Sequence, residues 1–90
     1  MIIKVVFEYD NDFDYVYCKN NIDIDIDDFH KWIYEDKTHP FWVYENGNAL
    51  GVDYRGEAIS YWINKFKNNE SYILKSFTTE EKKHDLLIKL

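Results

Sequence analysis

The spacing of the hydrophobic residues changes between residues 22 and 33, and this change constrains the fold most. From Ile22 to Ile26, isoleucine alternates strictly with aspartate, which is the period-2 pattern of a strand with one buried face. Further on, Phe29, Trp32 and Ile33 follow the i, i+3, i+4 spacing that is typical of an amphipathic helix. This short stretch therefore predicts a strand that runs directly into a helix.

The rest of the chain repeats these two patterns. The pair Asn46-Gly47 lies between two apolar runs, and this is the strongest short signal for a β-hairpin. Residues 78–85 predict a short helix capped by Thr78 or Thr79, and residues 86–90 predict either a last strand or a helix end. The other predictions are strands at 2–9, 15–19, 41–45, 49–54 and 71–77 and a second helix at 56–68.

These elements predict an α+β fold in one domain that spans residues 1–90. We expect a mostly antiparallel sheet of four to six strands, with two amphipathic helices packed on one face. Trp32 and Trp62 lie on the apolar stripes of these helices and are expected in the core. Hydrophobic residues make up 46% of the chain, which is enough to form such a core without a disulfide or a metal.

Cys18 is the only cysteine, so the chain has neither an intrachain disulfide nor a pair of cysteine metal ligands. Its place in the middle of a predicted strand favours a buried and inert thiol. The alternative is a nucleophile that pairs with His30 or His39 and an aspartate. No glycine-rich loop accompanies Cys18, so we expect the inert thiol.

The formal charge of −6 is distributed unevenly along the chain. Residues 1–45 hold eleven acidic residues against four lysines, a net of −7, and residues 46–90 hold six against seven basic residues, a net of +1. Direct binding to nucleic acid needs a basic face, so a basic protein is the expected partner. No signal peptide and no apolar run of membrane-spanning length is recognisable, so we expect a cytoplasmic protein without membrane contact.

The acidic stretch around residue 25 resembles a calcium loop only in part. Asp23, Asp25 and Asp27 match positions 1, 3 and 5 of such a loop, but Asp28 stands where glycine is needed and Tyr34 where glutamate is needed. In a strand, these carboxylates would also lie about 6.7 Å apart. We therefore expect no metal here, and we expect Asp27 to cap the following helix with Asp28 in its first turn.

The same acidic residues suggest a surface that docks onto a basic protein, such as a nuclease or a DNA-binding protein. One charge per ~6.7 Å of strand is about half the density of a DNA strand, so neighbouring turns would have to contribute to any mimicry of DNA. The alternative is an ordinary solvated face. The candidate docking residues are Asp10, Asp12, Asp14, Asp23, Asp25, Asp27, Asp28, Glu35 and Asp36.

An aromatic pair is a second candidate for binding. On residues 41–45, Trp42 and Tyr44 share one face, while Phe41 and Val43 share the other. One pair is expected in the core, and the other needs a cover. We expect the C-terminal segment to supply this cover, and the alternative is a protein partner, for which exposed aromatic pairs are typical anchors.

No motif for a nucleotide, a metal or a catalytic nucleophile is present, so we expect a non-enzymatic binding module without a cofactor. The composition, rich in Asn, Ile, Lys, Tyr and Asp, resembles that of accessory and inhibitor proteins of phages and mobile elements, such as anti-CRISPR and anti-restriction proteins. This resemblance implies an inhibitor of a nucleic-acid-handling protein. The alternatives are a small metal-dependent hydrolase and a structural, self-associating module, and both a monomer and a homodimer stay open.

Overall fold

The computed structural model describes residues 1–90 and contains six strands and two helices. Four strands form a mixed sheet in the order β5-β2-β1-β6, and the other two form a separate hairpin, β3-β4. The α+β prediction is confirmed. The elements are β1 (Ile2–Val6), β2 (Phe13–Cys18), α1 (Ile26–Glu35), β3 (Trp42–Glu45), β4 (Asn48–Val52), α2 (Gly56–Phe66), β5 (Ser71–Thr78) and β6 (Leu86–Lys89).

The sheet buries one face because its strands bring their alternate apolar residues into register. β1 and β2 pair antiparallel with Ile3 opposite Val16, and both side chains are buried. β6 runs parallel to β1 and places Ile88 opposite Val5, which extends the same apolar face. Residues 86–89 are thus a strand, which decides between the two predictions for this segment.

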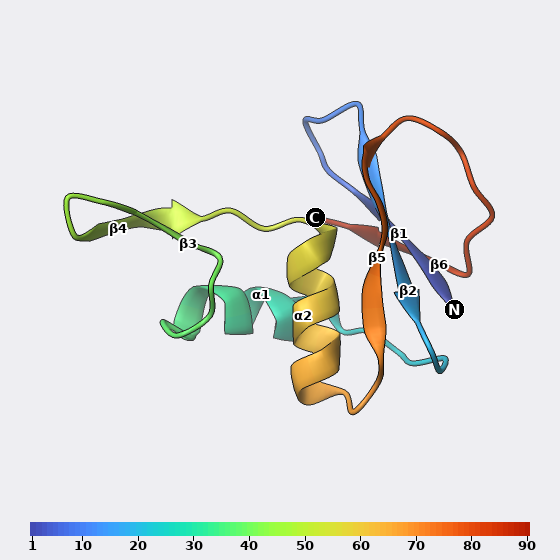
Figure 1. Ribbon diagram of the computed structural model, residues 1–90, viewed down its shortest axis with the longest axis horizontal. Coiled ribbons are helices and arrows are strands. Elements are labelled where there is room, and N and C mark those ends of the chain that lie inside the picture. The colour runs from blue at the N-terminus through green and yellow to red at the C-terminus, as the bar shows by residue number, and fades with distance from the viewer.

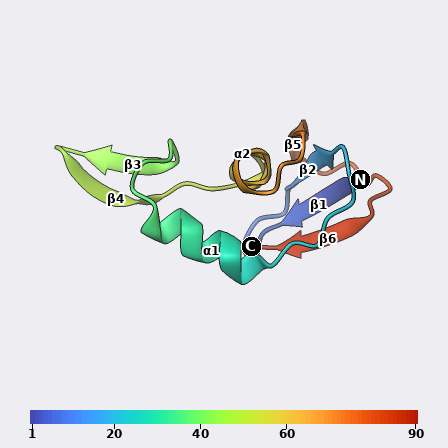
Figure 2. The same cartoon turned by 90° about the horizontal axis from the view of Figure 1, so that it is seen from below.

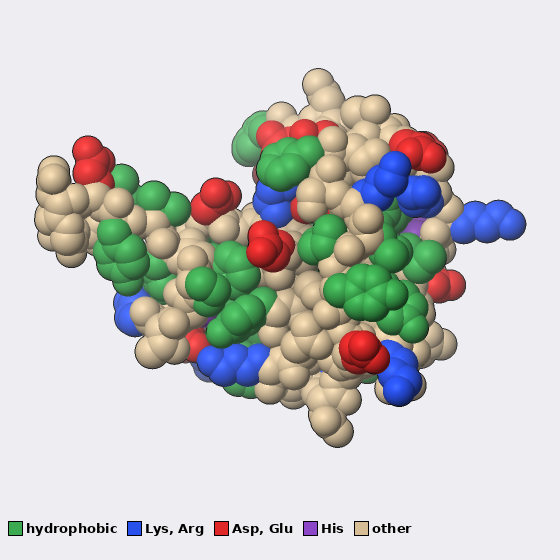
Figure 3. All heavy atoms as spheres, viewed as in Figure 1, with side chains coloured by type: hydrophobic (Ala, Val, Ile, Leu, Met, Phe, Trp, Pro, Cys, Tyr) green, Lys and Arg blue, Asp and Glu red, His purple; other side chains and the backbone are tan.

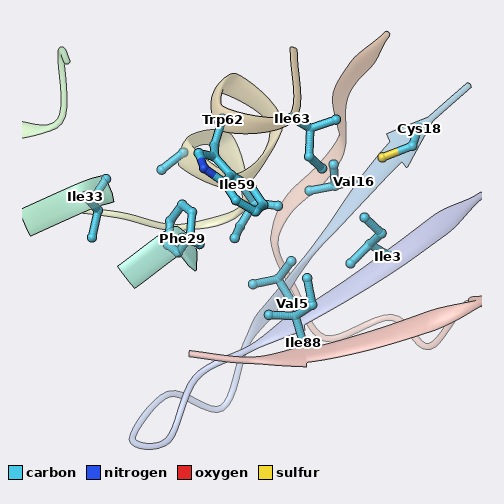
Figure 4. Close-up of a cluster of buried hydrophobic side chains, with 11 residues drawn as sticks. Ile3, Val5, Val16, Cys18, Phe29, Ile33, Ile59, Trp62, Ile63 and Ile88 are labelled. Carbon is cyan, nitrogen blue, oxygen red and sulfur yellow. The ribbon is translucent and has the colours of Figure 1, made fainter. Parts of the chain in front are cut away.

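Both helices lie on one side of this sheet (Figures 1 and 2). α2 presents Ile59, Trp62 and Ile63 to the sheet, and α1 adds Phe29 and Ile33 to the same cluster. Figure 4 shows these side chains converging with those of β1, β2 and β6. The helical spacing read from the sequence therefore identifies the buried faces correctly.

The strand predicted at residues 22–26 is wrong. Residues 21–25 pair with no other strand, and helix α1 already begins at Ile26. The alternation itself is real, because Ile22 and Ile24 pack on the core while Asp23 and Asp25 are exposed. An extended segment on the core surface produces the same period as a strand without forming a ladder.

The short helix predicted at residues 78–85 is also wrong. Thr78 is the last residue of β5, and the following residues form a loop without a helical turn. Contacts with the sheet hold this loop: the Lys82 backbone N–H donates to the Tyr15 hydroxyl at 2.7 Å, and Lys4 pairs with Glu81 at 2.7 Å. These tertiary contacts replace the capping interactions that the sequence suggests.

The hairpin at Asn46-Gly47 is confirmed and stands apart from the rest of the molecule (Figure 1). Asn46 has φ of 52° and Gly47 has φ of 79°, as a type I′ turn requires at both central residues. Every residue from 43 to 50 is exposed. The hairpin therefore projects into solvent beyond Trp42 and Val52.

Candidate protein-docking surface

The acidic stretch before and within the first turn of α1 is fully on the surface. Asp23 and Asp25 precede the helix, Asp27 and Asp28 lie in its first turn, and all four are exposed. None of the four forms an ion pair with a lysine or an arginine of the chain. We call these four residues the acidic surface, and no ion pair within the fold neutralises its charge.

The helix N-terminus itself favours this concentration of negative charge. Asp25, rather than the predicted Asp27, is the N-cap, and its Oδ1 accepts a hydrogen bond from the Asp27 backbone N–H at 3.0 Å. The positive end of the helix dipole stabilises carboxylates in the first turn, where Asp27 and Asp28 lie. The capping prediction is therefore wrong by two residues, because the helix starts earlier than the apolar spacing alone indicates.

Replacement of the cap tests this local account. We expect Asp25→Ala to lower the free energy of unfolding by about 1 kcal/mol, because the Asp27 N–H loses its acceptor. Asp23→Ala removes the same charge without a capping bond and should change stability by less than about 0.5 kcal/mol. Urea unfolding of both variants measures the difference, and equal losses would show that Asp25 does not stabilise the helix as a cap.

Glu35 and Asp36 lie at the other end of α1, and Glu35 is about 10–15 Å along the helix axis from Asp28 and Asp25 of the acidic surface. Glu35 is exposed, but the Asp36 carboxylate already forms hydrogen bonds within the chain. It accepts hydrogen bonds from the Thr38 hydroxyl at 2.6 Å, from the Thr38 backbone N–H at 2.8 Å and from Trp32 Nε1 at 3.0 Å. The bonds from Thr38, with that from Trp32, lower the pKa of Asp36 to about 2. Asp36 therefore stabilises the turn after the helix.

Asp10, Asp12 and Asp14 surround a single cation, Arg55. Asp14 accepts hydrogen bonds from Arg55 Nε at 3.2 Å and Nη2 at 2.9 Å, and Asp12 accepts from Nη2 at 3.0 Å. Asp10 adds a longer ion pair of 3.4 Å with Nη1. Arg55 thus neutralises one of the three negative charges of this turn and holds the carboxylates within the fold.

Asp14 is the buried centre of this cluster and is only 1% exposed. Besides Arg55, it accepts hydrogen bonds from the backbone N–H groups of Gly56 and Phe77, each at 2.9 Å. Burial alone would raise the pKa of Asp14, but these hydrogen bonds together hold it below its usual value. The carboxylate joins β2, α2 and β5 and presents no free charge to a partner.

Two phenylalanine rings contact Arg55, and a glycine lies against Asp14. The guanidinium lies between the rings of Phe7 and Phe77, 4.2 and 3.8 Å from their centroids. Phe77 has φ of 52°, which is rare for an aromatic residue, and its N–H donates to Asp14. At Gly56 a side-chain Cβ would lie 2.9 Å from the Asp14 Cβ, so glycine is required there.

Sequence reasoning missed Arg55 entirely. One signal was available, because Arg55 is the only arginine of the chain and three aspartates alternate at positions 10, 12 and 14. Arginine is the residue that pairs with carboxylates in bidentate geometry. Because 41 to 45 residues separate Arg55 from these aspartates along the chain, no local pattern joined them.

Trp42 and Tyr44, the aromatic pair, differ in their exposure to solvent. Trp42 is half-buried, donates from Nε1 to the Asp36 carbonyl at 2.7 Å and stacks on His39. Tyr44 is 56% exposed. The expected cover by the C-terminal segment is wrong, because β6 pairs with β1 in the other sheet.

The side chains considered for catalysis and metal binding are dispersed. Cys18 is buried, as expected, and burial raises the pKa of its thiol. His39 is buried too: its Nε2 lies 2.7 Å from the Ile33 carbonyl, and its Nδ1 accepts from the Phe41 backbone N–H. No three His, Cys, Asp or Glu side chains lie close enough together to hold a metal ion.

No protein-family model, curated protein or solved structure matches this chain. Neither helix has the length and apolar character needed to cross a membrane.

Proposed function

We propose that this protein is a non-enzymatic binding module that docks onto a basic protein through the acidic surface. One observation carries this proposal: Asp23, Asp25, Asp27 and Asp28 are exposed, and no cation of the chain pairs with them. The acids of the 10–14 turn differ in this respect, because Arg55 already binds them. The acidic surface is therefore the densest group of unpaired carboxylates in the negative half, with four in six positions.

The physical effect of such a surface is mainly on encounter and specificity. Clustered like charges attract an oppositely charged partner and raise the rate of association, while they repel acidic proteins. The four carboxylates fall within six positions, and the Debye length at physiological salt is about 8 Å, so they act together at contact distance. Association should therefore weaken steeply as the salt concentration rises.

The partner that fits this surface presents lysine and arginine side chains spaced to bind phosphates. Proteins that hold nucleic acid have such faces, and nucleases and DNA-binding proteins are examples. In this proposal the acidic surface occupies part of the phosphate-binding face and inhibits the partner. The composition, which resembles that of phage and mobile-element inhibitors, supports this form of the proposal.

Neutralising the acidic surface is the direct test. The variant Asp23→Asn, Asp25→Asn, Asp27→Asn, Asp28→Asn keeps the cap, because asparagine is also a good N-cap residue. Each surface charge contributes about 0.5–1 kcal/mol, so four should weaken binding by about 2–4 kcal/mol, or roughly 30- to 1000-fold. Tagged wild type and variant are passed through bacterial lysate at low salt and eluted with a salt step, and the bound proteins are identified by mass spectrometry.

A matched control variant removes four other exposed and unpaired charges: Glu45→Gln, Asp53→Asn, Glu57→Gln and Glu70→Gln. It has the same net charge as the test variant. We expect it to retain the basic, nucleic-acid-handling protein that the test variant loses. Equal loss from both variants would mean that only the total charge matters, and retention by the test variant would refute the role of the acidic surface.

A further inference from the structure

The β3-β4 hairpin lacks the contacts that normally stabilise a two-stranded sheet. An isolated hairpin is marginally stable in water unless a third strand or a helix packs against it. Here every residue from 43 to 50 is exposed, including the large side chains of Val43, Tyr44 and Leu50. Figure 3 shows hydrophobic side chains gathered along this projecting hairpin. A further strand added to the hairpin would supply the missing contacts.

Edge strands are usually protected from pairing with other chains by lysines, prolines or bulges. β5 carries Lys75 and two register shifts, and β6 ends at Lys89. In β4, Leu50 has no partner between the pairs Val43–Gly51 and Tyr44–Ala49, so this strand is bulged. β3 has neither a lysine, nor a proline, nor a bulge of its own, and it is the unprotected edge of the molecule.

The outer edge of β3 is also free to form hydrogen bonds. Outside the ladder with β4, no backbone–backbone hydrogen bond involves Val43, Tyr44 or Glu45. In an antiparallel ladder, alternate residues direct their N–H and C=O groups away from the existing partner strand. These groups of β3 therefore face outward and can pair with another strand.

The low charge of the hairpin indicates which kind of partner it can bind. Glu45 is the only charged residue between 43 and 50, in a chain with a formal charge of −6. The hairpin therefore adds little like-charge repulsion where it meets the same hairpin of a second copy. A basic partner, in contrast, would be drawn to the acidic surface and not to the hairpin. The local neutrality therefore favours a second copy of this chain.

We propose that β3 pairs antiparallel with β3 of a second copy across a two-fold axis, with Val43 opposite Val43 of the other copy. This pairing gives a four-stranded sheet in the order β4-β3-β3-β4. It places Trp42 opposite Tyr44 of the other copy, and aromatic cross-strand pairs of this kind stabilise sheets. In Figure 2 the hairpin lies beyond the C-terminal end of α1, so the acidic surface at the other end stays accessible in both copies.

A cysteine at the two-fold axis tests the register. Opposite residues of an antiparallel pair have Cα atoms about 4.5–5.5 Å apart, which lies within the range of about 4.4–6.8 Å for disulfides. We expect Val43→Cys to form a disulfide-linked dimer under mild oxidation, at least about tenfold faster than the matched variant Leu50→Cys. The native thiol of Cys18 is buried and should not compete. Equal cross-linking of the two variants would overturn the proposal.

Sedimentation over a range of concentrations tests the dimer without cross-linking. Wild type should shift from monomer to dimer below about 1 mM, and Val43→Lys should raise the dissociation constant at least about tenfold, because two like charges would then lie opposite one another. Leu50→Lys adds the same charge to β4 and should change it by less than about threefold. A wild type that stays monomeric throughout this range, or equal effects of the two lysines, would overturn the proposal.

Discussion

Replacement of Asp14 by alanine is expected to lower the free energy of unfolding by about 3 kcal/mol, because it leaves Arg55 without its main partner inside the fold. The Asp14 carboxylate accepts hydrogen bonds from Arg55, Gly56 and Phe77, so three elements lose a common acceptor. Because Arg55 is 17% exposed, the low end of the range for broken buried ion pairs applies. Urea unfolding followed by far-ultraviolet circular dichroism measures the loss.

The neighbouring aspartate provides the control. Asp12→Ala removes a carboxylate that is 32% exposed and contacts the same guanidinium, and we expect a loss below about 1 kcal/mol. In a double-mutant cycle of Asp14→Ala with Arg55→Met, the combined loss should be smaller than the sum of the two single losses. Losses of equal size for Asp12 and Asp14 would show that burial does not set the strength of this cluster.

Replacement of Phe29 by alanine should lower the free energy of unfolding by about 3–5 kcal/mol. Phe29 is fully buried and packs edge-on against Trp62 and Tyr54, so its removal leaves a cavity between α1 and α2. A protein of this size has a total stability of about 5–10 kcal/mol, so the variant should be close to unfolding at 37 °C. Thermal and urea unfolding provide the measurement.

A second phenylalanine separates burial from residue type. Phe66 is 50% exposed at the end of α2 and contacts the Trp32 ring from the surface. Phe66→Ala should cost about 1 kcal/mol or less. If this variant lost as much stability as Phe29→Ala, the assignment of Phe29 to the core would be wrong.

The sequence predicted the helices and most strands because their signals are local. The apolar stripes of α1 and α2 recur every three or four residues, and the turn at Asn46-Gly47 needs only two adjacent residues. These patterns depend on neighbours along the chain, which a single sequence contains in full. Trp62 was placed in the core correctly for the same reason, whereas Trp32, expected there too, is only partly buried and packs against the core.

The two wrong predictions share a physical cause. Residues 22–26 alternate like a strand but have no strand beside them, and residues 78–85 have helix-capping chemistry but are held by the sheet. In both segments tertiary contacts decide the conformation, and these contacts come from residues far away in the sequence. Local preference is a weak guide wherever such contacts compete with it.

The candidate site shows the same limit. That Asp23 and Asp28 are charged and exposed follows from their local pattern, but the neutralisation of Asp14 by Arg55 does not. A run of charged residues in the sequence does not show which oppositely charged residues lie beside it in the fold. Only the folded structure separates the four free carboxylates from those that Arg55 binds.

The position of β1 has a consequence for the synthesis of this protein. β1 lies between β2 and β6, but β6 follows it by about eighty residues, so one side of β1 has no partner until Leu86–Lys89 have left the ribosome. Pairings of such long sequence separation also close slowly. A nascent chain halted before β6 would expose the strand edge formed by Ile3, Lys4 and Val5. Whether such a chain folds or aggregates would then depend on a chaperone that shields this edge.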